Sequence, residues 1–359
     1  MSKTLQDIRR RDSDVASPRA RENLPIAATP AVRRKRIVIV GCGFAGIAAA
    51  RALKRSDADI ILIDRRNHHI FQPLLYQVAT SVLAPSEIAA PIRQLADKQE
   101  NVSVVLAEVT GIDLNSRSVE ASCPGLGVRR IEFDYLIIAT GMQPSYFGHD
   151  EFVKYAPGLK NLSDAETIRA KILSAYELAE TTDNENERVR QMTFVLVGAG
   201  ATGVELAASM AQLAAVTLRK EVRRIDPAKS SIILIEGGTR ILPTFAESLA
   251  KKAATRLEKL GVQIMTGARV EQVDEIGVIA DGKRIPSATV LWTAGVTASP
   301  LAKLLGAKTD RAGRALVGPY MNVVEAAGVF VVGDASSVVR ANGRPVPEAA
   351  IQNIDLWTA

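Results

Sequence analysis

The sequence predicts an α/β protein whose two parallel-sheet domains form an internal repeat, with the second domain inserted into the first. Three observations predict this fold class. A Gly-x-Gly-x-x-Gly motif occurs twice, each copy follows a short apolar strand, and each copy opens an alanine-rich helix. In this strand, turn and helix context the motif indicates a Rossmann-like dinucleotide-binding domain. Strand and helix patterns alternate along the 359 residues, a length that accommodates two domains.

The first copy of the motif runs from Gly41 to Gly46 and follows the apolar strand 36–40. Gly41 permits the tight turn, Gly43 lets the backbone approach a pyrophosphate, and Gly46 lets the helix pack on the strand. We expect the pyrophosphate at the N-terminus of the helix, where free N–H groups and the helix dipole favour an anion. The next strand ends at Asp64, near the spacing of a carboxylate that binds ribose hydroxyls.

The second copy, at 198–203, follows the apolar strand 193–197 in the same way. The next apolar strand, 232–235, ends at Glu236, so a carboxylate again follows the motif. The connection between motif and acid is longer here because it contains a charged stretch at 218–224, which is predicted to be helical.

Both halves end in a similar apolar strand followed by a glycine, at 135–141 in the first half and at 290–295 in the second. Motif, acid and closing strand recur in one order, which is a strong signal of an internal repeat. The alternative is that the glycines serve only to pack helices on strands. The repeat and its two acids favour two bound dinucleotides instead, and two facing dinucleotides imply electron transfer between them.

The two halves are predicted to bind different dinucleotides. Glu236 is followed by two glycines rather than an arginine. Its carboxylate is therefore expected to accept a hydrogen bond from a ribose 2′-OH and to repel a 2′-phosphate, which indicates NAD(H) rather than NADP(H). Strand 329–332 ends in a Gly-Asp pair that could bring a carboxylate to the ribitol of a flavin, which indicates FAD in the first half. The predicted FAD contacts are Gly41, Gly43, Phe44, Ala45, Gly46, Asp64, Arg65, Val109, Thr140, Gly141, Gly333 and Asp334. The predicted NAD(H) contacts are Gly198, Gly200, Thr202, Gly203, Glu236 and Gly295.

The net charge of +6 belongs to the N-terminal segment. Residues 1–36 hold ten lysines and arginines against four acids, a composition typical of a disordered tail. We expect this tail to be solvated, with weak attraction to an anionic membrane as the alternative. Nothing beyond this charge favours nucleic-acid binding. The predicted domains are a disordered basic tail at 1–34, an FAD-binding domain at 35–160 and 300–359, and an NADH-binding domain at 161–299.

Cys42 and Cys123 do not form a closely spaced pair, which argues against a redox dithiol. Electrons are therefore expected to leave the flavin directly for a diffusible acceptor. No metal site is predicted, since the sequence has no cluster of cysteine and histidine. The apolar stretches 37–50 and 192–218 contain the glycine motifs, so neither is predicted to span a membrane and a cytoplasmic protein is expected.

Glu205 stands two residues after Gly203, at the start of the second motif helix. One interpretation is that its carboxylate only complements the helix dipole. The other is that it orients the nicotinamide carboxamide or relays a proton, which would make Glu205 a catalytic residue. The sequence leaves both open.

The run 68–80, His-His-Ile-Phe-Gln-Pro-Leu-Leu-Tyr-Gln-Val-Ala-Thr, resembles the type II NADH dehydrogenases, single-subunit NADH:quinone oxidoreductases of respiratory membranes. Segments 146–150, 238–243 and 292–296 agree, and the resemblance covers about 35–334. It implies a non-covalent FAD with NADH on one flavin face and a quinone on the other. It also implies peripheral attachment to the cytoplasmic side of the cell membrane through a C-terminal region.

The C-terminal part departs from the family pattern. The family carries a quinone-site motif Ala-Gln-x-Ala-x-Gln, and residues 347–352 here read Pro-Glu-Ala-Ala-Ile-Gln. Gln352 matches the second glutamine and is predicted to act at the quinone side, while Glu348 replaces the first. The family normally continues beyond the position of Ala359, so the FAD domain is expected to be C-terminally incomplete and a chain ending here to be soluble. Whether the protein forms a homodimer stays open.

The resulting hypothesis is FAD-dependent oxidation of NADH, with hydride passing from nicotinamide C4 to flavin N5 and two electrons then passing to a membrane quinone, without proton pumping. Within the oxidoreductases the alternative is a soluble NADH oxidase or a reductase of a small electron-carrier protein. From another class, the alternative is a non-catalytic NADH-binding redox regulator.

Overall fold

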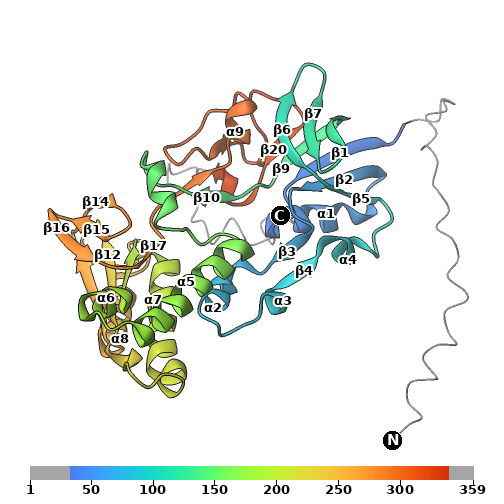
Figure 1. Cartoon of the computed structure of the whole chain (residues 1–359). Coiled ribbons are helices and arrows are strands. Elements are labelled where there is room, and N and C mark those ends of the chain that lie inside the picture. Colours follow the sequence, from blue (N-terminus) through green and yellow to red (C-terminus); the bar gives the residue numbers. More distant parts are fainter. Residues whose placement is uncertain (1–32, 339–359) are drawn as a thin grey trace, which may run out of the picture. The chain divides into compact units, whose positions relative to one another are not determined.

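The computed structural model describes residues 33–338, and its main strands form two parallel sheets (Figure 1). The order is β20-β9-β1-β2-β5 in the first sheet and β13-β12-β11-β17 in the second. The strands of the first sheet are β1 (Lys35–Val40), β2 (Ala58–Asp64), β5 (Val102–Leu106), β9 (Tyr135–Ile138) and β20 (Val329–Val331). Those of the second are β11 (Thr193–Val197), β12 (Ser231–Glu236), β13 (Val262–Thr266) and β17 (Thr289–Trp292).

The two sheets repeat one plan, as predicted. Strands β5, β2, β1 and β9 of the first sheet correspond in order to β13, β12, β11 and β17 of the second. Each half also carries an antiparallel three-stranded sheet before its closing strand. These sheets are β6 (Glu108–Asp113), β7 (Ser118–Cys123) and β8 (Gly127–Glu132), and β14 (Val270–Val273), β15 (Gly277–Ala280) and β16 (Lys283–Pro286).

The first sheet is completed only after the second has been built, which confirms the predicted interruption. Strand β20 pairs in parallel with β9, although the whole second sheet separates them in the chain. The chain passes between the sheets through a two-stranded antiparallel ribbon of β10 (Met142–Pro144) and β18 (Val296–Ala298). The numerical domain bounds given above stay a prediction, and the tail at 1–32 and Gln352 lie outside the described residues.

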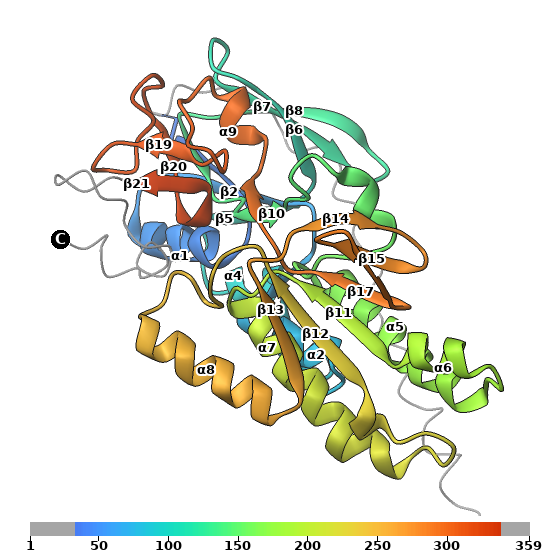
Figure 2. The ribbon, with the colours of Figure 1, turned by 90° about the vertical axis from the view of Figure 1, so that its left-hand side faces the viewer.

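The helices follow from the glycine motifs and from apolar spacing. The two motif helices are α1 (Phe44–Ala52) and α7 (Ala201–Gln212). Helices α7 and α8 (Glu247–Lys259) lie beside the strands of the second sheet (Figure 2). The remaining helices longer than six residues are α5 (Leu162–Thr181) and α6 (Glu185–Gln191). Shorter helices are α2 (Leu75–Ala79), α3 (Pro85–Ile88), α4 (Ile92–Ala96) and α9 (Leu301–Leu304). The short strands β3 (His68–Ile70) and β4 (Ala89–Pro91) pair with each other, as do β19 (Ala315–Val317) and β21 (Ser336–Val338).

Both parallel sheets are buried in their centres. All five residues of β11 are buried, and the last four of β1 are as well. A parallel strand that is covered on both faces has a continuous apolar sequence rather than alternating apolar and polar residues. This is why these strands could be predicted from the sequence. The largest apolar cluster packs α2, α5 and α7 against the second sheet.

The charged stretch at 218–224 was predicted to be helical, and this is only partly correct. Helix α7 continues through a π-helical turn at Leu213–Thr217 and a 3-10 turn at Leu218–Lys220, where the helical backbone ends. Beyond it the chain is held by an acid from another helix, because Glu180 accepts the next backbone N–H groups. Within the described residues, Ala201–Lys220 is the one helical run long and apolar enough to cross a membrane, and half of its most apolar stretch is buried inside the protein.

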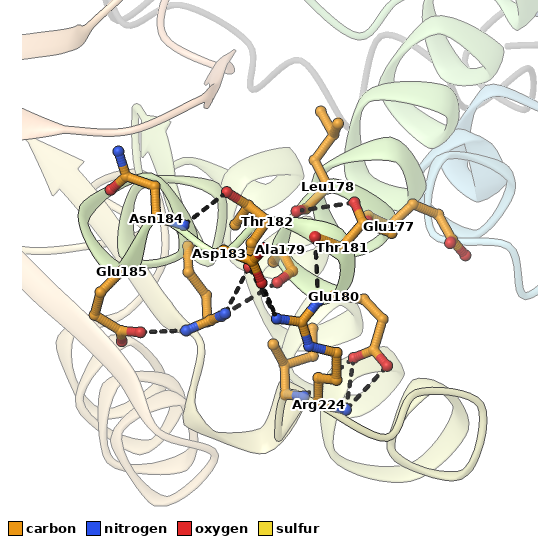
Figure 3. A network of polar contacts seen from close by, with 12 residues as sticks. Glu177, Leu178, Ala179, Glu180, Thr181, Thr182, Asp183, Asn184, Glu185 and Arg224 are labelled. Atoms are coloured by element: carbon orange, nitrogen blue, oxygen red, sulfur yellow. Dashed lines mark hydrogen bonds and ion pairs between the residues drawn. The ribbon is translucent and has the colours of Figure 1, made fainter.

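A polar network closes the C-terminus of α5 (Figure 3). Arg188 donates to the carbonyl oxygens of Ala179 and Thr182, at 3.3 and 2.6 Å. Arg224 donates to the carbonyl oxygen of Thr181 at 3.2 Å. Cations at the last carbonyls of a helix complement its dipole. These two arginines therefore have a structural role, which is to cap the C-terminus of α5.

Glu180 supplies the matching negative charge. Its carboxylate accepts the backbone N–H groups of Arg223, Arg224 and Ile225 at 2.8 to 3.1 Å. Desolvation acts to raise the pKa of Glu180, but these N–H donors outweigh it and hold the pKa below its usual range. A carboxyl whose folded-state pKa is lowered stabilises the fold above its unfolded pKa, and this contribution is lost as pH falls through the folded value.

We therefore expect Glu180→Gln to lower the melting temperature at neutral pH. The difference from wild type should begin to shrink as the pH falls below about 4.3, the pKa of the unfolded-state carboxyl, and should vanish below the lowered folded-state pKa, where the wild-type carboxyl is neutral as well. Glu177→Gln, one turn earlier on the same helix, is the matched control and should leave the melting temperature unchanged. Thermal unfolding between about pH 3 and 7 measures both, and a difference that does not depend on pH would contradict the role of this charge.

Candidate functional site

The first and third glycines of each motif are required by the fold itself. Gly41 and Gly198 have φ angles of +105° and +101°. A Cβ on Gly46 would lie 1.8 Å from the carbonyl oxygen of Gly41, and one on Gly203 would lie 2.0 Å from that of Gly198. Both distances are far inside van der Waals contact, so each helix approaches its strand only because glycine stands there.

The middle glycines are different. Gly43 and Gly200 have φ angles of −71° and −70°, which any residue can adopt, and a Cβ on either would meet nothing within 4 Å. Each is the N-cap of its helix without a side-chain cap, and neither helix has an acid in its first turn. The open space faces helix N–H groups that need an acceptor. Each site therefore fits a phosphate group.

The two acids occupy matching positions. Asp64 accepts the backbone N–H of Cys42 at 2.7 Å, and Glu236 accepts that of Ala199 at 2.8 Å. Cys42 and Ala199 each follow the first glycine of a motif. Each carboxylate thus holds its glycine turn in place and keeps lone pairs with which it can accept from ribose hydroxyls. The sequence predicted the second of these roles but not the first.

Further predicted FAD contacts gather at the first motif. A Cβ on Gly333 would lie 2.8 Å from the Cβ of Ala45, so Gly333 and the half-buried Asp334 after it reach the start of α1. Thr140 lies behind Gly41, and its hydroxyl is buried without a hydrogen-bond partner among the described residues. A buried hydroxyl of this kind calls for an explanation, and a ligand that bonds to it is one.

Arg65 and Val109 come shortly after strands β2 and β5 of the first sheet, Val109 as part of β6. Arg65 follows β2 and forms an exposed ion pair with Glu108, at 3.6 Å between Nη1 and Oε1. The side chain of Val109 is buried in the core, so a ligand could contact this residue only through its backbone. Gly141, with a φ of +62°, follows the closing strand β9.

The predicted NAD(H) contacts gather at the second motif. Thr202 is exposed in the first turn of α7. Gly295 follows the closing strand β17, and a Cβ there would lie 2.3 Å from the ring of Phe147, which is 68% exposed. Glu205 lies one turn further along α7, and partial burial raises the pKa of its carboxyl.

The structure adds an aromatic corner, formed by Phe44, His69 and Phe71, that no local sequence pattern predicts. Phe44 meets the rings of His69 and Phe71 edge-on, with centroids 5.1 and 5.6 Å apart. His69 Nδ1 lies 3.0 Å from the carbonyl oxygen of Cys42 in the motif turn. His69 and Phe71 belong to the run 68–80, which stands out in the sequence by its family resemblance. The spacing of this run does not predict that it lies beside the first motif.

The two cysteines offer no dithiol. Cys42 and Cys123 are both free and buried. Burial, and then the charge of Asp64, raises the pKa of the Cys42 thiol well above its usual range, so this thiol is a poor nucleophile. Residues 33–338 contain no group of three or more histidine, cysteine or acidic side chains that could hold a metal ion.

Comparison with known proteins agrees with this geometry. Residues 35–357 match the family model described as pyridine nucleotide-disulphide oxidoreductase. The chain is 45% identical over 337 residues to the type II NADH:quinone oxidoreductase Ndh of Mycobacterium tuberculosis, covering 91% of this chain and 72% of that protein. It is 31% identical to a probable NADH dehydrogenase of Dictyostelium discoideum, covering 90% and 72%. The structure of NDH2 from Plasmodium falciparum in complex with NADH shares the fold, with a TM-score of 0.78 at 24% identity, covering 85% of this chain and 65% of that one.

Proposed function

Because the chain belongs to the pyridine nucleotide-disulphide oxidoreductases and, among them, to the type II NADH:quinone oxidoreductases, we propose that it oxidises NADH and reduces a quinone with FAD as its resident cofactor. The observation that carries this proposal is the pair of matched sites, each with an open helix N-terminus and a carboxylate on its glycine turn. Relatives named for this reaction, aligned over nine-tenths of the chain, supply the assignment of the acceptor.

The first site holds FAD in this proposal. The N-terminus of α1 above Gly43 binds the pyrophosphate, and Asp64 accepts from the ribose of its adenosine. Asp334 accepts from the ribitol, and the hydroxyl of Thr140 bonds to the cofactor instead of remaining without a partner. When bound, FAD supplies a two-electron carrier between the nicotinamide and the quinone.

The second site holds NADH. The N-terminus of α7 above Gly200 binds the pyrophosphate, and Glu236 accepts from the ribose 2′-OH, which favours NADH over NADPH. Glu205 is proposed to orient the nicotinamide carboxamide or to hold a proton, and its raised pKa suits the second task. Gln352, outside the described residues, is proposed for the quinone side.

The electrons pass directly to the acceptor, since the described residues contain no dithiol. The proposal includes peripheral contact with the cytoplasmic face of the cell membrane, where the quinone is dissolved, and no translocation of protons. A homodimer is compatible with it, and no nucleic-acid partner is part of it. The alternatives that remain are an NADH oxidase, a reductase of an electron carrier, and a regulator that binds NADH without turnover.

Steady-state oxidation of NADH, measured with and without a soluble short-chain quinone, separates these functions. We expect turnover that depends on the quinone and is slow with oxygen alone. Equal rates with and without quinone would indicate an NADH oxidase. A flavin that NADH reduces but no quinone reoxidises would contradict the proposal and favour the regulator.

A further inference from the structure

A buried pair of hydroxyl groups joins the two halves of the protein. Thr80, at the end of α2, places its Oγ1 2.6 Å from the Oγ of Ser209 in α7. Thr80 is fully buried, and Ser209 is 8% exposed. Helix α2 comes from the connection between β2 and β5 of the first sheet, whereas α7 is the helix that the second motif opens. The pair therefore links an element of the first half to the motif helix of the second half through the protein interior.

The direction of these hydrogen bonds follows from their partners. The hydroxyl of Thr80 also lies 2.8 Å from the carbonyl oxygen of Tyr76, one turn earlier in α2. A hydroxyl has one hydrogen and a carbonyl can only accept, so Thr80 donates to Tyr76 and Ser209 donates to Thr80. Both hydroxyl hydrogens are used, and the chain of bonds ends on the backbone of α2.

The surroundings of the pair are apolar. Leu75 and Val78 of α2 are buried in one cluster with Ile172 of α5 and with Leu206 and Met210 of α7. Apolar burial is non-directional, so it holds the short helix α2 in place without fixing its position along α7. A hydrogen bond between two buried groups is directional. Leaving one buried hydroxyl without its partner costs more free energy than the hydrogen bond itself contributes to stability.

Both ends of the link are close in the chain to the proposed chemistry. Helix α2 follows the aromatic corner, with Phe71 four residues before Leu75. Ser209 lies one helical turn after Glu205 on the same side of α7. A shift of α2 along α7 would therefore move the aromatic corner at the first motif relative to Glu205 at the second.

We propose that the hydroxyl pair of Thr80 and Ser209 is a positioning device that fixes the separation of the nicotinamide from the flavin. The inference rests on the proposed function. Hydride transfer needs reacting atoms about 3 to 3.5 Å apart, and a misplacement of about 1 Å can cost about a hundredfold in rate. Neither residue belongs to the predicted contacts of either dinucleotide, so both act through α2 and α7.

Thr80→Val tests this, because valine keeps the shape of threonine and removes its hydroxyl. In FAD-loaded protein, stopped-flow absorbance should show the limiting rate of flavin reduction at saturating NADH falling about tenfold or more. The Kd for NADH, from the same titration, should stay within about twofold, since no contact to NADH is lost. Ser209→Ala should give the same result from the other helix, and Thr80→Ser should restore the wild-type rate.

Thr181→Val is the matched control. The Thr181 hydroxyl also donates to the carbonyl oxygen one turn earlier, that of Glu177 at 2.9 Å, but it is exposed and reaches no other helix. Amide hydrogen exchange supplies a readout without turnover, and we expect faster exchange in α2 for Thr80→Val and no change for Thr181→Val.

The outcomes separate the inference from the function on which it rests. If exchange in α2 rises while the limiting rate stays within about twofold of wild type, the pair is only structural and the inference is overturned. If the Kd for NADH rises as much as the limiting rate of flavin reduction falls, the pair does not act by fixing the separation of the nicotinamide from the flavin. That result would overturn the inference as well. If wild-type flavin is not reduced by NADH at all, the proposed function itself has failed.

Discussion

Gly200→Val should abolish tight NADH binding while the protein remains folded and keeps its FAD. The backbone of Gly200 suits any residue, and a side chain there would meet no protein atom within 4 Å. The valine would instead fill the space above the N-terminus of α7 and exclude the pyrophosphate. Loss of two charge-assisted hydrogen bonds, at about 1.5 to 3 kcal/mol each, raises the Kd by roughly a hundredfold or more.

Two variants make this prediction specific. Gly43→Val, the matched change in the first motif, should lower the FAD content and leave binding of NAD⁺ to the second site intact. Gly203→Ala should reduce the yield of folded protein, because its Cβ would lie 2.0 Å from the carbonyl oxygen of Gly198. Titration calorimetry with NAD⁺, the flavin absorbance and the melting temperature measure the three effects. Wild-type affinity for NADH in Gly200→Val would refute the placement of the pyrophosphate.

Glu236→Gln should raise the KM for NADH by about tenfold or more. It should also reduce the preference of the enzyme for NADH over NADPH. Glutamine has almost the same shape, but it loses a charge-assisted bond to the ribose, at about 1.5 to 3 kcal/mol, and no longer repels a 2′-phosphate. Since ribose contacts are alike in the ground and transition states, kcat should change little.

The structure adds a reason to prefer glutamine over alanine at this position. Glu236 also accepts the N–H groups of Ala199 and Gly238, both at 2.8 Å and on different carboxylate oxygens, so glutamine keeps one of these two bonds, whereas alanine would lose both as well as the ribose contact. Steady-state kinetics with NADH and NADPH give both KM values. Asp64→Asn is the counterpart in the first half and should act on FAD retention. An unchanged KM for NADH in Glu236→Gln would show that this carboxylate does not bind the ribose.

The repeat was predictable because its signals are local. Glycine spacing, the apolar strands and the acid at each strand end are all read within one βα unit, and the structure places Asp64 and Glu236 at equivalent points. The end of the helical backbone at Lys220 could not be predicted, because the chain just beyond it is held by Glu180, far away in sequence, which accepts the backbone N–H groups of Arg223 and Arg224. The aromatic corner and the bond between Thr80 and Ser209 likewise depend on contacts across long chain separations. No periodicity records such contacts.

The ribbon of β10 and β18 has a consequence for the order in which the chain can fold. Pro144 pairs with Val296, and Trp292 donates through Nε1 to the carbonyl oxygen of Ser145 at 2.8 Å, so the ends of the inserted half lie together. Once that half has formed, it acts as a short bridge between β9 and β20 rather than as a long open loop. The entropic cost of bringing β20 to β9 is then smaller, because folding of the inserted half has already brought the ends of this long connection together. During synthesis β20 emerges after the other four strands of the first sheet, so this sheet gains its final strand only after the whole inserted half has been synthesised.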